Sequence, residues 1–198
     1  HCESSAASDV YKRQDLFREF VKETGYPCTL TLMGLGAYPS SDPQFLGMLG
    51  MHGTYEANLA MHGCDVMINI GARFDDRVTG LLSAFSPGSK KIHVDIDPSS
   101  INKNVSVDVP VVGDAATVLA QMLEVWRRKK YSADKPALEA WWRQINLWRQ
   151  RDCLGFRQTG DVIRPQHAIR RLFEKTAERE CFISTEVGQH QMWAAQYY

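Results

Sequence analysis

Glycine and carboxylate residues stand at the carboxyl ends of four predicted strands of this chain. Glycine lets the backbone approach a phosphate closely, and a carboxylate accepts hydrogen bonds from the hydroxyl groups of a ribose or ribityl chain. In an open parallel sheet, ligands bind outside the carboxyl ends of the strands. These residue types therefore indicate a nucleotide site. They are Gly34, Gly36, Gly71, Asp95, Asp97, Gly113 and Asp114.

The separation between Gly71 and Asp95 is close to the offset of about 20 residues found in dinucleotide-binding folds. The full G-x-G-x-x-G pattern of those folds is absent from the chain. Spacing alone therefore leaves two interpretations open, which are a dinucleotide site of another pattern and ordinary turns at the strand ends.

The segment GARFDDR (71–77) brings two arginines and two aspartates into one short loop. Arg73 and Arg77 offer planar guanidinium groups, which suit the oxygens of a pyrophosphate. A solvated ionic loop is the alternative. The segment follows DVMINI (65–70), which the sequence predicts as the most buried strand, and this position favours a ligand-binding loop.

The histidines do not indicate a metal site. His52 and His62 have no third ligand at a useful spacing, and no H-E-x-x-H motif is present. His62 is better explained as a partner for the dipole at the end of a helix. Gln189 and His190 follow a predicted strand and Gly188, which is a favourable but weakly specific place for phosphate contacts.

Hydrophobic periodicity predicts strands and helices that alternate along the chain. The predicted strands are 28–33, 65–70, 91–97 and 109–112, and the predicted helices are 15–24, 54–62 and 115–126. A Gly- and Pro-containing segment, 37–53, lies between the first strand and the second helix. This alternation predicts an α/β fold with a parallel sheet over about 15–126.

The chain divides into four predicted parts. Residues 1–14 are Ser/Ala-rich without periodicity and are predicted to be a non-native leader, with a native disordered tail as the alternative. Residues 15–126 are predicted to form the sheet domain. A linker, 127–160, carries a helix whose Trp141, Trp142 and Trp148 are expected in the core. Residues 161–198 begin another domain, with a helix near Pro165, a buried stripe of Ile169, Leu172 and Phe173, and a strand, CFISTEV (181–187). Because this strand is followed by no further βα unit, we expect the second domain to be truncated.

Composition excludes several classes of protein. Hydrophobic residues make up 44% and charged residues 23%, which excludes wholesale disorder. Lys+Arg and Asp+Glu both number 23, so binding to nucleic acid through bulk charge is not expected. No apolar run reaches the roughly 20 residues of a transmembrane helix. The five scattered cysteines, without a C-x-x-C pair, favour reduced thiols in an intracellular protein.

Several segments resemble the catalytic subunit of the acetolactate synthase (acetohydroxyacid synthase) family of thiamine-diphosphate-dependent enzymes. MLGMHGTYEAN and GARFDDRVTG are the most specific parts of the resemblance. The similar segments are 30–80, IHVDIDPSSINKN (92–104), VPVVGDA (109–115) and GQHQMWAAQ (188–196). The resemblance implies a Rossmann-like, FAD-binding middle domain, an interdomain linker, and the first βα elements of a truncated domain that binds thiamine diphosphate.

Carried over residue by residue, the resemblance implies two sets of cofactor-binding residues. The FAD set is Thr31, Leu32, Met33, Met51, His52, Gly53, Thr54, Gly71, Ala72, Arg73, Asp75, Arg77, Val78, Asp95, Ile96, Gly113 and Asp114. The thiamine diphosphate set is Val187, Gly188, Gln189 and His190. Glu186 departs from the family, which usually has Gly or Asp at that position.

The resemblance also implies a reaction and partners. Thiamine diphosphate and Mg²⁺ would serve decarboxylation of pyruvate, and the two-carbon unit would then add to a second 2-keto acid such as pyruvate or 2-ketobutyrate, with FAD taking no net redox part. A homodimer or homotetramer, a regulatory small subunit, and a bacterial cytoplasmic or eukaryotic organellar location are implied for the full-length enzyme. The activating glutamate and the magnesium-binding segment have no counterpart in this chain, so we expect no catalytic residue and no activity in it alone.

Two alternatives remain beside this interpretation. One is another thiamine-diphosphate enzyme, such as glyoxylate carboligase or a pyruvate oxidase, although MLGMHGTYEAN and GARFDDRVTG argue against it. The other is a non-catalytic module that binds NAD or FAD. A self-contained module is not expected to end soon after a strand, which argues against the second alternative.

Overall fold

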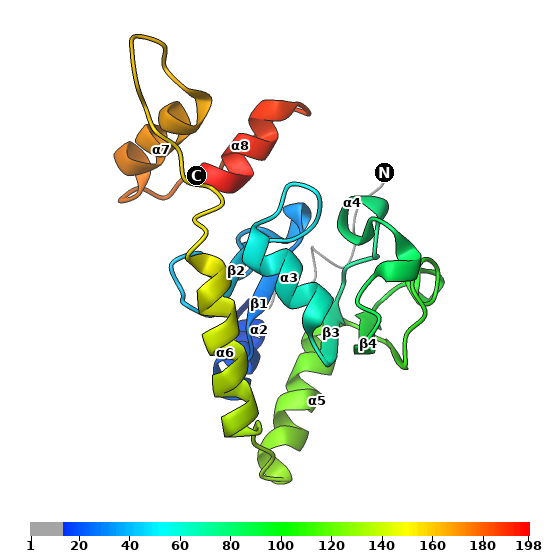
Figure 1. The fold of residues 1–198 in the computed structure, drawn as a ribbon. Coiled ribbons are helices and arrows are strands. Elements are labelled where there is room, and N and C mark those ends of the chain that lie inside the picture. Colours follow the sequence, from blue (N-terminus) through cyan, green and yellow to red (C-terminus); the bar gives the residue numbers. More distant parts are fainter. Residues whose placement is uncertain (1–13) are drawn as a thin grey trace. The chain divides into compact units, whose positions relative to one another are not determined.

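The computed structural model describes residues 14–198, and the described chain divides after Gln150 into two compact units. Each unit is described here by itself (Figure 1). Predictions about residues 1–13, including most of the predicted leader, fall outside the described residues. The domain boundaries at residues 126 and 160 stay predictions.

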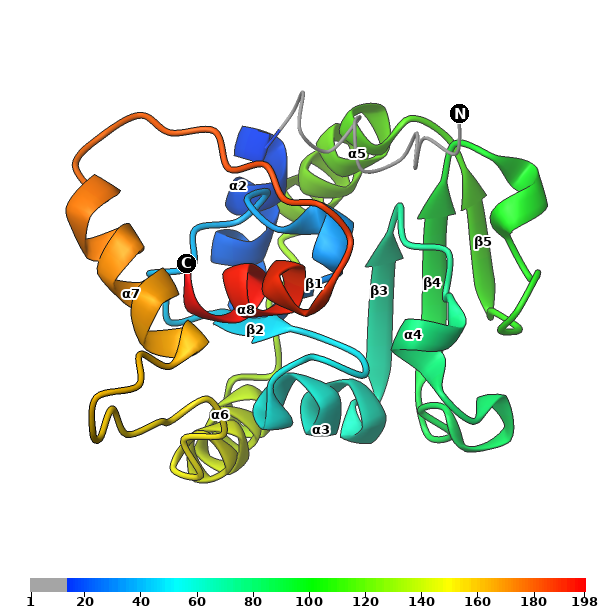
Figure 2. The same cartoon turned by 90° about the horizontal axis from the view of Figure 1, so that it is seen from above.

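Among the described residues, the first unit holds five parallel strands in two sheets. One sheet pairs β1 (Cys28–Leu30) with β2 (Phe45–Met48), and the other has the order β3 (Val66–Ile70), β4 (Lys90–Asp95), β5 (Val109–Val112). Figure 2 shows β3, β4 and β5 lying side by side. The predicted α/β class with parallel strands is confirmed, but the strands do not form one continuous sheet.

Three details of the strand prediction are wrong. β2 lies within the Gly- and Pro-containing segment 37–53, where no strand was predicted, and the first strand ends at Leu30, where a 3₁₀ helix (Leu32–Gly34) soon follows. The most buried strand is β4 rather than β3, because β4 is the middle strand of its sheet and β3 lies at its edge. Val66 in β3 is accordingly 49% exposed.

Besides the short α4 (Asp76–Thr79), four longer helices of the described residues surround these strands, and short polar side chains cap three of them. The helices are α2 (Gln14–Thr24), α3 (Tyr55–Gly63), α5 (Ala115–Arg128) and α6 (Lys135–Arg149). Thr54, Asp114 and Asp134 each accept a hydrogen bond from a backbone N–H of the first helical turn of α3, α5 and α6. Asp15, predicted as a cap, lies inside α2 instead, while Gly25 follows the end of α2 with φ +73°, as predicted.

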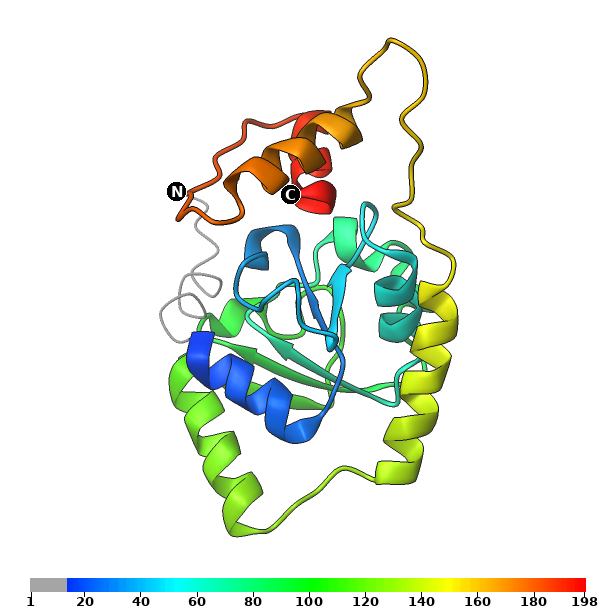
Figure 3. The ribbon, with the colours of Figure 1, turned by 90° about the vertical axis from the view of Figure 1, so that its left-hand side faces the viewer.

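The helices pack in two pairs, α2 with α5 and α3 with α6 (Figure 3). Phe20, Leu119 and Leu123 form the core of the first pair. Leu46, Ala57, Ala60 and Ile145 form the core of the second, and the tryptophans of α6 pack against it. The prediction that Trp141, Trp142 and Trp148 belong to a core is therefore confirmed.

The second unit consists of α7 (Pro165–Thr176), α8 (Gln189–Tyr197) and irregular segments. The hydroxyls of Thr176 and Tyr198 lie 2.6 Å apart, and this hydrogen bond connects the last residue of α7 with the residue that follows α8. The predicted strand 181–187 is wrong, because these residues are irregular, the second unit has no strand to pair with them, and Phe182 is 95% exposed. The stripe of Ile169, Leu172 and Phe173 is not buried either, since Ile169 is only half-buried and Leu172 and Phe173 are exposed.

Candidate nucleotide site

The carboxyl ends of β3, β4 and β5 meet at one edge of their sheet. The Gly71 N–H donates to the Val94 carbonyl at 2.8 Å, and the Gly113 N–H donates to the Asp95 carbonyl at 3.0 Å. Three of the four predicted strand ends are therefore hydrogen-bonded neighbours. Such an edge is where parallel α/β sheets bind their ligands.

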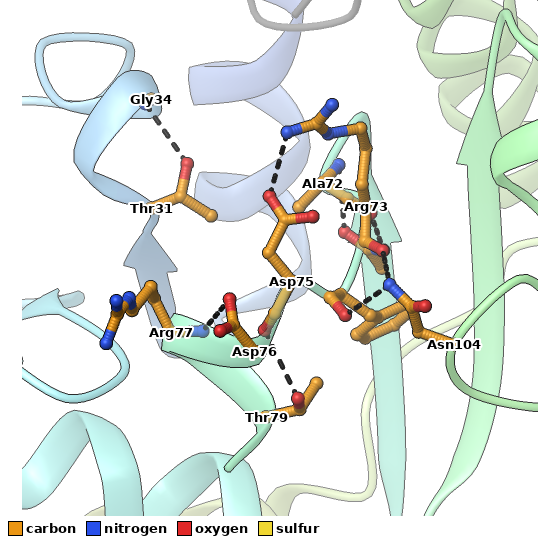
Figure 4. A network of polar contacts seen from close by, with 11 residues as sticks. Thr31, Gly34, Ala72, Arg73, Asp75, Asp76, Arg77, Thr79 and Asn104 are labelled. Atoms are coloured by element: carbon orange, nitrogen blue, oxygen red, sulfur yellow. Dashed lines mark hydrogen bonds and ion pairs between the residues drawn. The ribbon is translucent and has the colours of Figure 1, made fainter. Parts of the chain in front are cut away.

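The loop 71–77 is held by side-chain amides on two sides (Figure 4). Asn69, in β3, donates to the Ala72 carbonyl at 2.5 Å and accepts from the Ala72 N–H at 3.2 Å. Asn104 donates to the Phe74 carbonyl at 3.0 Å. Gly71 and Phe74 both have positive φ, and the buried Phe74 ring anchors the loop against Phe85. These contacts hold the backbone of the loop, while its charged side chains Arg73, Asp75, Asp76 and Arg77 lie exposed at the surface.

The two arginines of this loop present their guanidinium groups at the surface. The Arg73 Nη2 lies 2.9 Å from the Asp75 Oδ2, and the two side chains are 44% and 49% exposed. An ion pair that exposed contributes little stability, so it leaves Arg73 able to exchange its partner for a phosphate. The Arg77 Nη1 lies 3.8 Å from the Met51 sulfur. The role of both arginines in binding an anion stays a prediction.

The segment 50–54 is tied to the same loop. The Met51 N–H donates to the Arg77 carbonyl at 2.8 Å, and the Asn58 amide bonds both the N–H and the carbonyl of Gly50, at 2.8 and 2.9 Å. The Thr54 hydroxyl donates to the Leu46 carbonyl at 2.5 Å. Gly50 and Met51 therefore lie against Arg77, and Thr54 ties the end of the segment to β2.

We expect Gly50→Ala to displace this segment. Gly50 has φ +95°, and a Cβ atom there would lie 2.4 Å from the Arg77 carbonyl oxygen. Strained backbone of this kind costs about 1–3 kcal/mol, which should lower the free energy of unfolding measured in urea. Gly88→Ala is the matched control, because nothing lies within 4 Å of its Cβ position. Equal stability of the two variants would show that the contact with Arg77 is not a constraint.

Thr31 and Asp114, at two further strand ends, cap the turns that follow them. Thr31 accepts from the Gly34 N–H at 3.2 Å, which closes the 3₁₀ helix that contains Leu32 and Met33 (Figure 4). Asp114 accepts from both the N–H and the hydroxyl of Thr117 at 2.9 Å. These contacts give Thr31 and Asp114 a structural role that does not depend on a ligand.

Asp95, at the end of β4, has a buried carboxylate that is only partly used. Its Oδ1 accepts from the Asp97 N–H at 2.9 Å, whereas its Oδ2 has no hydrogen bond within the described residues and lies 3.7 Å from the His93 Nε2. Asp95 is 3% exposed and His93 is completely buried. A buried acceptor without a donor is costly, so Asp95 Oδ2 fits a hydroxyl donor from a ligand. The next residue, Ile96, is exposed.

Burial lowers the pKa of His93, although the nearby Asp95 carboxylate opposes this shift. A neutral imidazole in the fold and a pKa of about 6.5 in the unfolded chain mean that the unfolded chain binds more protons below that pH. The contribution of His93 to the free energy of unfolding should therefore be fully present above about pH 6.5. It should be lost as the pH is lowered through the folded-state pKa of His93. Urea titrations from pH 7.5 to 5 should show a smaller loss in His93→Gln, and an equal loss would assign the effect to other groups.

The four residues predicted for thiamine diphosphate belong to the second unit, and the residues predicted for FAD belong to the first. Val187 is exposed, and Gly188 directly precedes α8. A Cβ on Gly188 would lie 2.8 Å from the His190 ring, so glycine lets that ring fold back toward the start of α8. Gln189 is the first residue of α8, whose free N–H groups favour an anion.

Neither a metal cluster nor a membrane helix was found in the part of the chain that the structure describes. Among residues 14–198, no group of three or more His, Cys, Asp or Glu side chains is placed to hold a metal ion. No helix of these residues has the length and apolar character needed to cross a membrane. The described candidate site is thus built from strand ends, glycines, arginines and one buried carboxylate.

Sequence reasoning missed the side chains that hold this site in shape. Asn58, Asn69 and Asn104 each bond a backbone group of a candidate loop, and none was singled out. An asparagine inside the apolar strand DVMINI was the available signal for Asn69, since a buried amide needs backbone partners.

The fold and the strand-end site define a class of protein. The family model described as "Thiamine pyrophosphate enzyme, central domain" matches residues 7–122, which is more than half of the chain. The chain therefore belongs to this family. The match begins inside the segment predicted as a leader.

The individual relatives to which the chain is similar are acetolactate synthases. The acetolactate synthase large subunit of Haemophilus influenzae is 48% identical over 180 residues, which cover 91% of this chain and 31% of that protein. The acetolactate synthase isozyme 3 large subunit of Escherichia coli is 46% identical, with 91% and 31% covered. The chloroplastic acetolactate synthase of Arabidopsis thaliana is 45% identical, with 93% and 27% covered. The chain thus spans less than a third of the length of these relatives.

Proposed function

We propose that this chain is the central part of an acetolactate synthase catalytic (large) subunit and that it binds FAD at the strand ends described above. The observation that carries the proposal is the 48% identity, over 91% of the chain, to a protein of that name. The relatives compared above share this name, so another thiamine-diphosphate enzyme and a non-catalytic module are not favoured.

The geometry supports FAD through three kinds of contact. The buried Asp95 Oδ2, which lacks a hydrogen bond, offers an acceptor for a ribose or ribityl hydroxyl. Arg73 and Arg77, on adjoining turns, offer donors for the pyrophosphate oxygens. Gly71 and Gly113 follow β3 and β5, on either side of β4, and a glycine at such a strand end lets a phosphate approach the backbone. We assign the remaining FAD residues of the sequence prediction to the walls of this site.

The second unit supplies one edge of the thiamine diphosphate site in this proposal. Val187, Gly188, Gln189 and His190 would hold phosphate oxygens at the N-terminus of α8. Thiamine diphosphate, when bound, supplies the nucleophilic carbon that releases carbon dioxide from pyruvate and passes the two-carbon unit to pyruvate or 2-ketobutyrate. The residues of this chain bind and orient the cofactors. None of them is proposed as a proton donor, a nucleophile or a Mg²⁺ ligand.

The relatives' names also support a proposal about assembly. Two of the compared relatives are named large subunits, which implies that the complete protein pairs with a small regulatory subunit. We propose a homodimer or homotetramer of the complete large subunit as the catalytic form.

Titration of FAD into the chain, followed by flavin fluorescence, tests the proposal. Binding should saturate, and Asp95→Asn should weaken it about tenfold, because the lost acceptor is worth about 1.4 kcal/mol. Asparagine keeps one side-chain oxygen for the Asp97 N–H, so the turn survives. Asp97→Asn is the matched control, since the exposed Asp97 carboxylate caps Ser99 and should change affinity less than about twofold. Equal affinities for the parent and Asp95→Asn would overturn the assignment of this carboxylate to FAD.

A further inference from the structure

A buried histidine lies beside the Asp95 carboxylate, and the proposed function gives it no role. His93 stands in β4, two residues before Asp95, and its side chain is completely buried. The two ring nitrogens of His93 and the Oδ2 of Asp95 are buried atoms without a hydrogen bond to any of the described residues. Buried polar atoms of native folds normally have partners, so three such atoms in one place indicate a specific role.

Asp95 Oδ2 is the acceptor that suits the histidine ring. The Nε2 of His93 lies 3.7 Å from Asp95 Oδ2, while the other oxygen, Oδ1, is held by the Asp97 N–H at 2.9 Å. An approach of about 0.7 Å would bring Nε2 and Oδ2 to an ordinary hydrogen-bond distance. The Ala72 carbonyl is another acceptor near the ring, but it already accepts from the Asn69 amide at 2.5 Å. Asp95 Oδ2 is therefore the acceptor that still needs a donor.

Packing holds the histidine ring between the two parts of the candidate site. The Phe74 ring meets the imidazole edge to face, with 5.1 Å between the ring centroids. Asn69 is the register partner of His93 in β3, and register partners of parallel strands present their side chains on the same face. Phe74 belongs to the loop 71–77. His93 thus contacts this loop on one side and lies beside the Asp95 carboxylate on the other.

The position of the carboxylate also selects one tautomer of the ring. A neutral imidazole carries its proton on one nitrogen only, and the other nitrogen is an acceptor. With the proton on Nδ1, the bare Nε2 would face the Asp95 oxygen, and two acceptors would lie against each other. Burial lowers the pKa of His93 and so favours the neutral ring. The Nε2–H tautomer is therefore the form expected above about pH 6.5.

We propose that His93 is a positioning residue of the FAD site, whose Nε2–H donates to Asp95 Oδ2 and holds this carboxylate for a hydroxyl group of the nucleotide. A carboxylate oxygen has two lone pairs, so Oδ2 can accept from His93 and from a ligand hydroxyl together. The inference rests on the proposed binding of FAD, because the role of His93 is exerted through Asp95. The His93–Asp95 pair itself belongs to the fold and can be measured without FAD.

NMR of the ¹⁵N-labelled full chain at pH 7.5, without FAD, tests the pair. Long-range ¹H–¹⁵N spectra should show the His93 proton on Nε2. In Asp95→Asn the amide oxygen stays on the Asp97 N–H and turns the NH₂ group toward His93, so the ring proton should move to Nδ1. The exposed His62 is the internal reference and should give the same spectrum in both chains. A His93 proton on Nδ1 in the parent, or on Nε2 in both chains, overturns the proposal.

FAD titrations followed by flavin fluorescence test the positioning role. His93→Leu removes the donor and should weaken FAD binding about fivefold, whereas His93→Gln keeps an N–H near the Nε2 position and should stay within about twofold of the parent. His62→Leu is the matched control at an exposed site and should leave the affinity unchanged. In the Asp95→Asn background, His93→Leu should have no further effect, because the carboxylate through which it acts is gone. Circular dichroism serves as the folding control.

The outcomes separate this inference from the proposed function. A loss in His93→Gln equal to that in His93→Leu, or equal losses from His93→Leu in the two backgrounds, would mean that His93 acts by packing alone and would overturn the inference. If His93→Leu does not fold, His93→Asn replaces it, since asparagine is too short to place an N–H at the Nε2 position. If the parent does not bind FAD, the proposed function fails and the positioning role with it, while the NMR spectra still decide whether the pair exists.

Discussion

Ile145→Ala should lower the free energy of unfolding by about 2–5 kcal/mol, the range for deleting a large aliphatic side chain in a core. The Ile145 side chain is completely buried between α6 and the cluster of Leu46, Ala57 and Ala60. Alanine would leave a void there, because the neighbouring tryptophan rings of α6 cannot collapse into the space. Urea unfolding followed by tryptophan fluorescence and by circular dichroism measures the loss.

Leu147→Ala is the matched control on the same helix. Leu147 is 58% exposed, so its truncation should cost less than about 0.5 kcal/mol. The comparison also tests the place of α6, which the sequence prediction assigned to a linker and the structure packs against α3. If Ile145→Ala costs no more than Leu147→Ala, α6 is an appended helix and not part of the first unit's core.

Local signals explain which parts of the fold were predictable. Thr54 and Asp114 precede apolar periodic segments and do cap α3 and α5, and DVMINI has the run of apolar residues that a strand needs. β2 was missed because its four residues, Phe45–Met48, include a glycine and lie in a segment with two prolines. The strand status of those residues comes from pairing with β1, which no local pattern contains.

The predicted strand 181–187 shows the opposite error. CFISTEV has the apolar and β-branched residues of a strand, yet no described strand lies beside it, and its residues stay exposed. Strand pairing is non-local, so composition gives the tendency of a segment and not its partner. The error at Asp15 has a different cause. Asp15 was predicted as a cap, but α2 includes Gln14 and Asp15, and a boundary shift of one or two residues changes the role of a side chain.

The candidate site was predicted as a set of strand ends. The structure adds which of these ends are neighbours and which side chains are buried there, and neither can be read from the sequence pattern. Gly71, Asp95 and Gly113 are far apart in the chain, and their proximity follows from the register of three parallel strands. The buried state of Asp95 depends on His93 and on the turn to Asp97, neither of which a motif specifies. The assignment of these residues to FAD stays a prediction.

Arg73→Ala should weaken FAD binding about 10- to 150-fold, which corresponds to a charge-assisted hydrogen bond worth about 1.5–3 kcal/mol. The Arg73 guanidinium lies at the surface beside Asp75, and its loop is fixed from below by Asn69 and Asn104. The backbone of the loop should therefore survive the truncation, and circular dichroism should be unchanged. Raising the ionic strength should weaken the parent more than the variant, since a phosphate contact is screened by salt.

Asp75→Asn separates a phosphate contact from a merely ionic turn. If Arg73 binds the pyrophosphate of FAD, the Asp75 carboxylate competes with it, and its removal should leave the affinity unchanged or raise it. If Arg73 serves only to hold Asp75, both variants should bind FAD as the parent does, and the site assignment at this loop would be wrong. A loss of affinity in Asp75→Asn equal to that in Arg73→Ala would mean that the pair acts by shaping the loop. Flavin fluorescence titrations of the three chains at two salt concentrations distinguish these outcomes, because only a direct phosphate contact makes the Arg73→Ala loss shrink as salt rises.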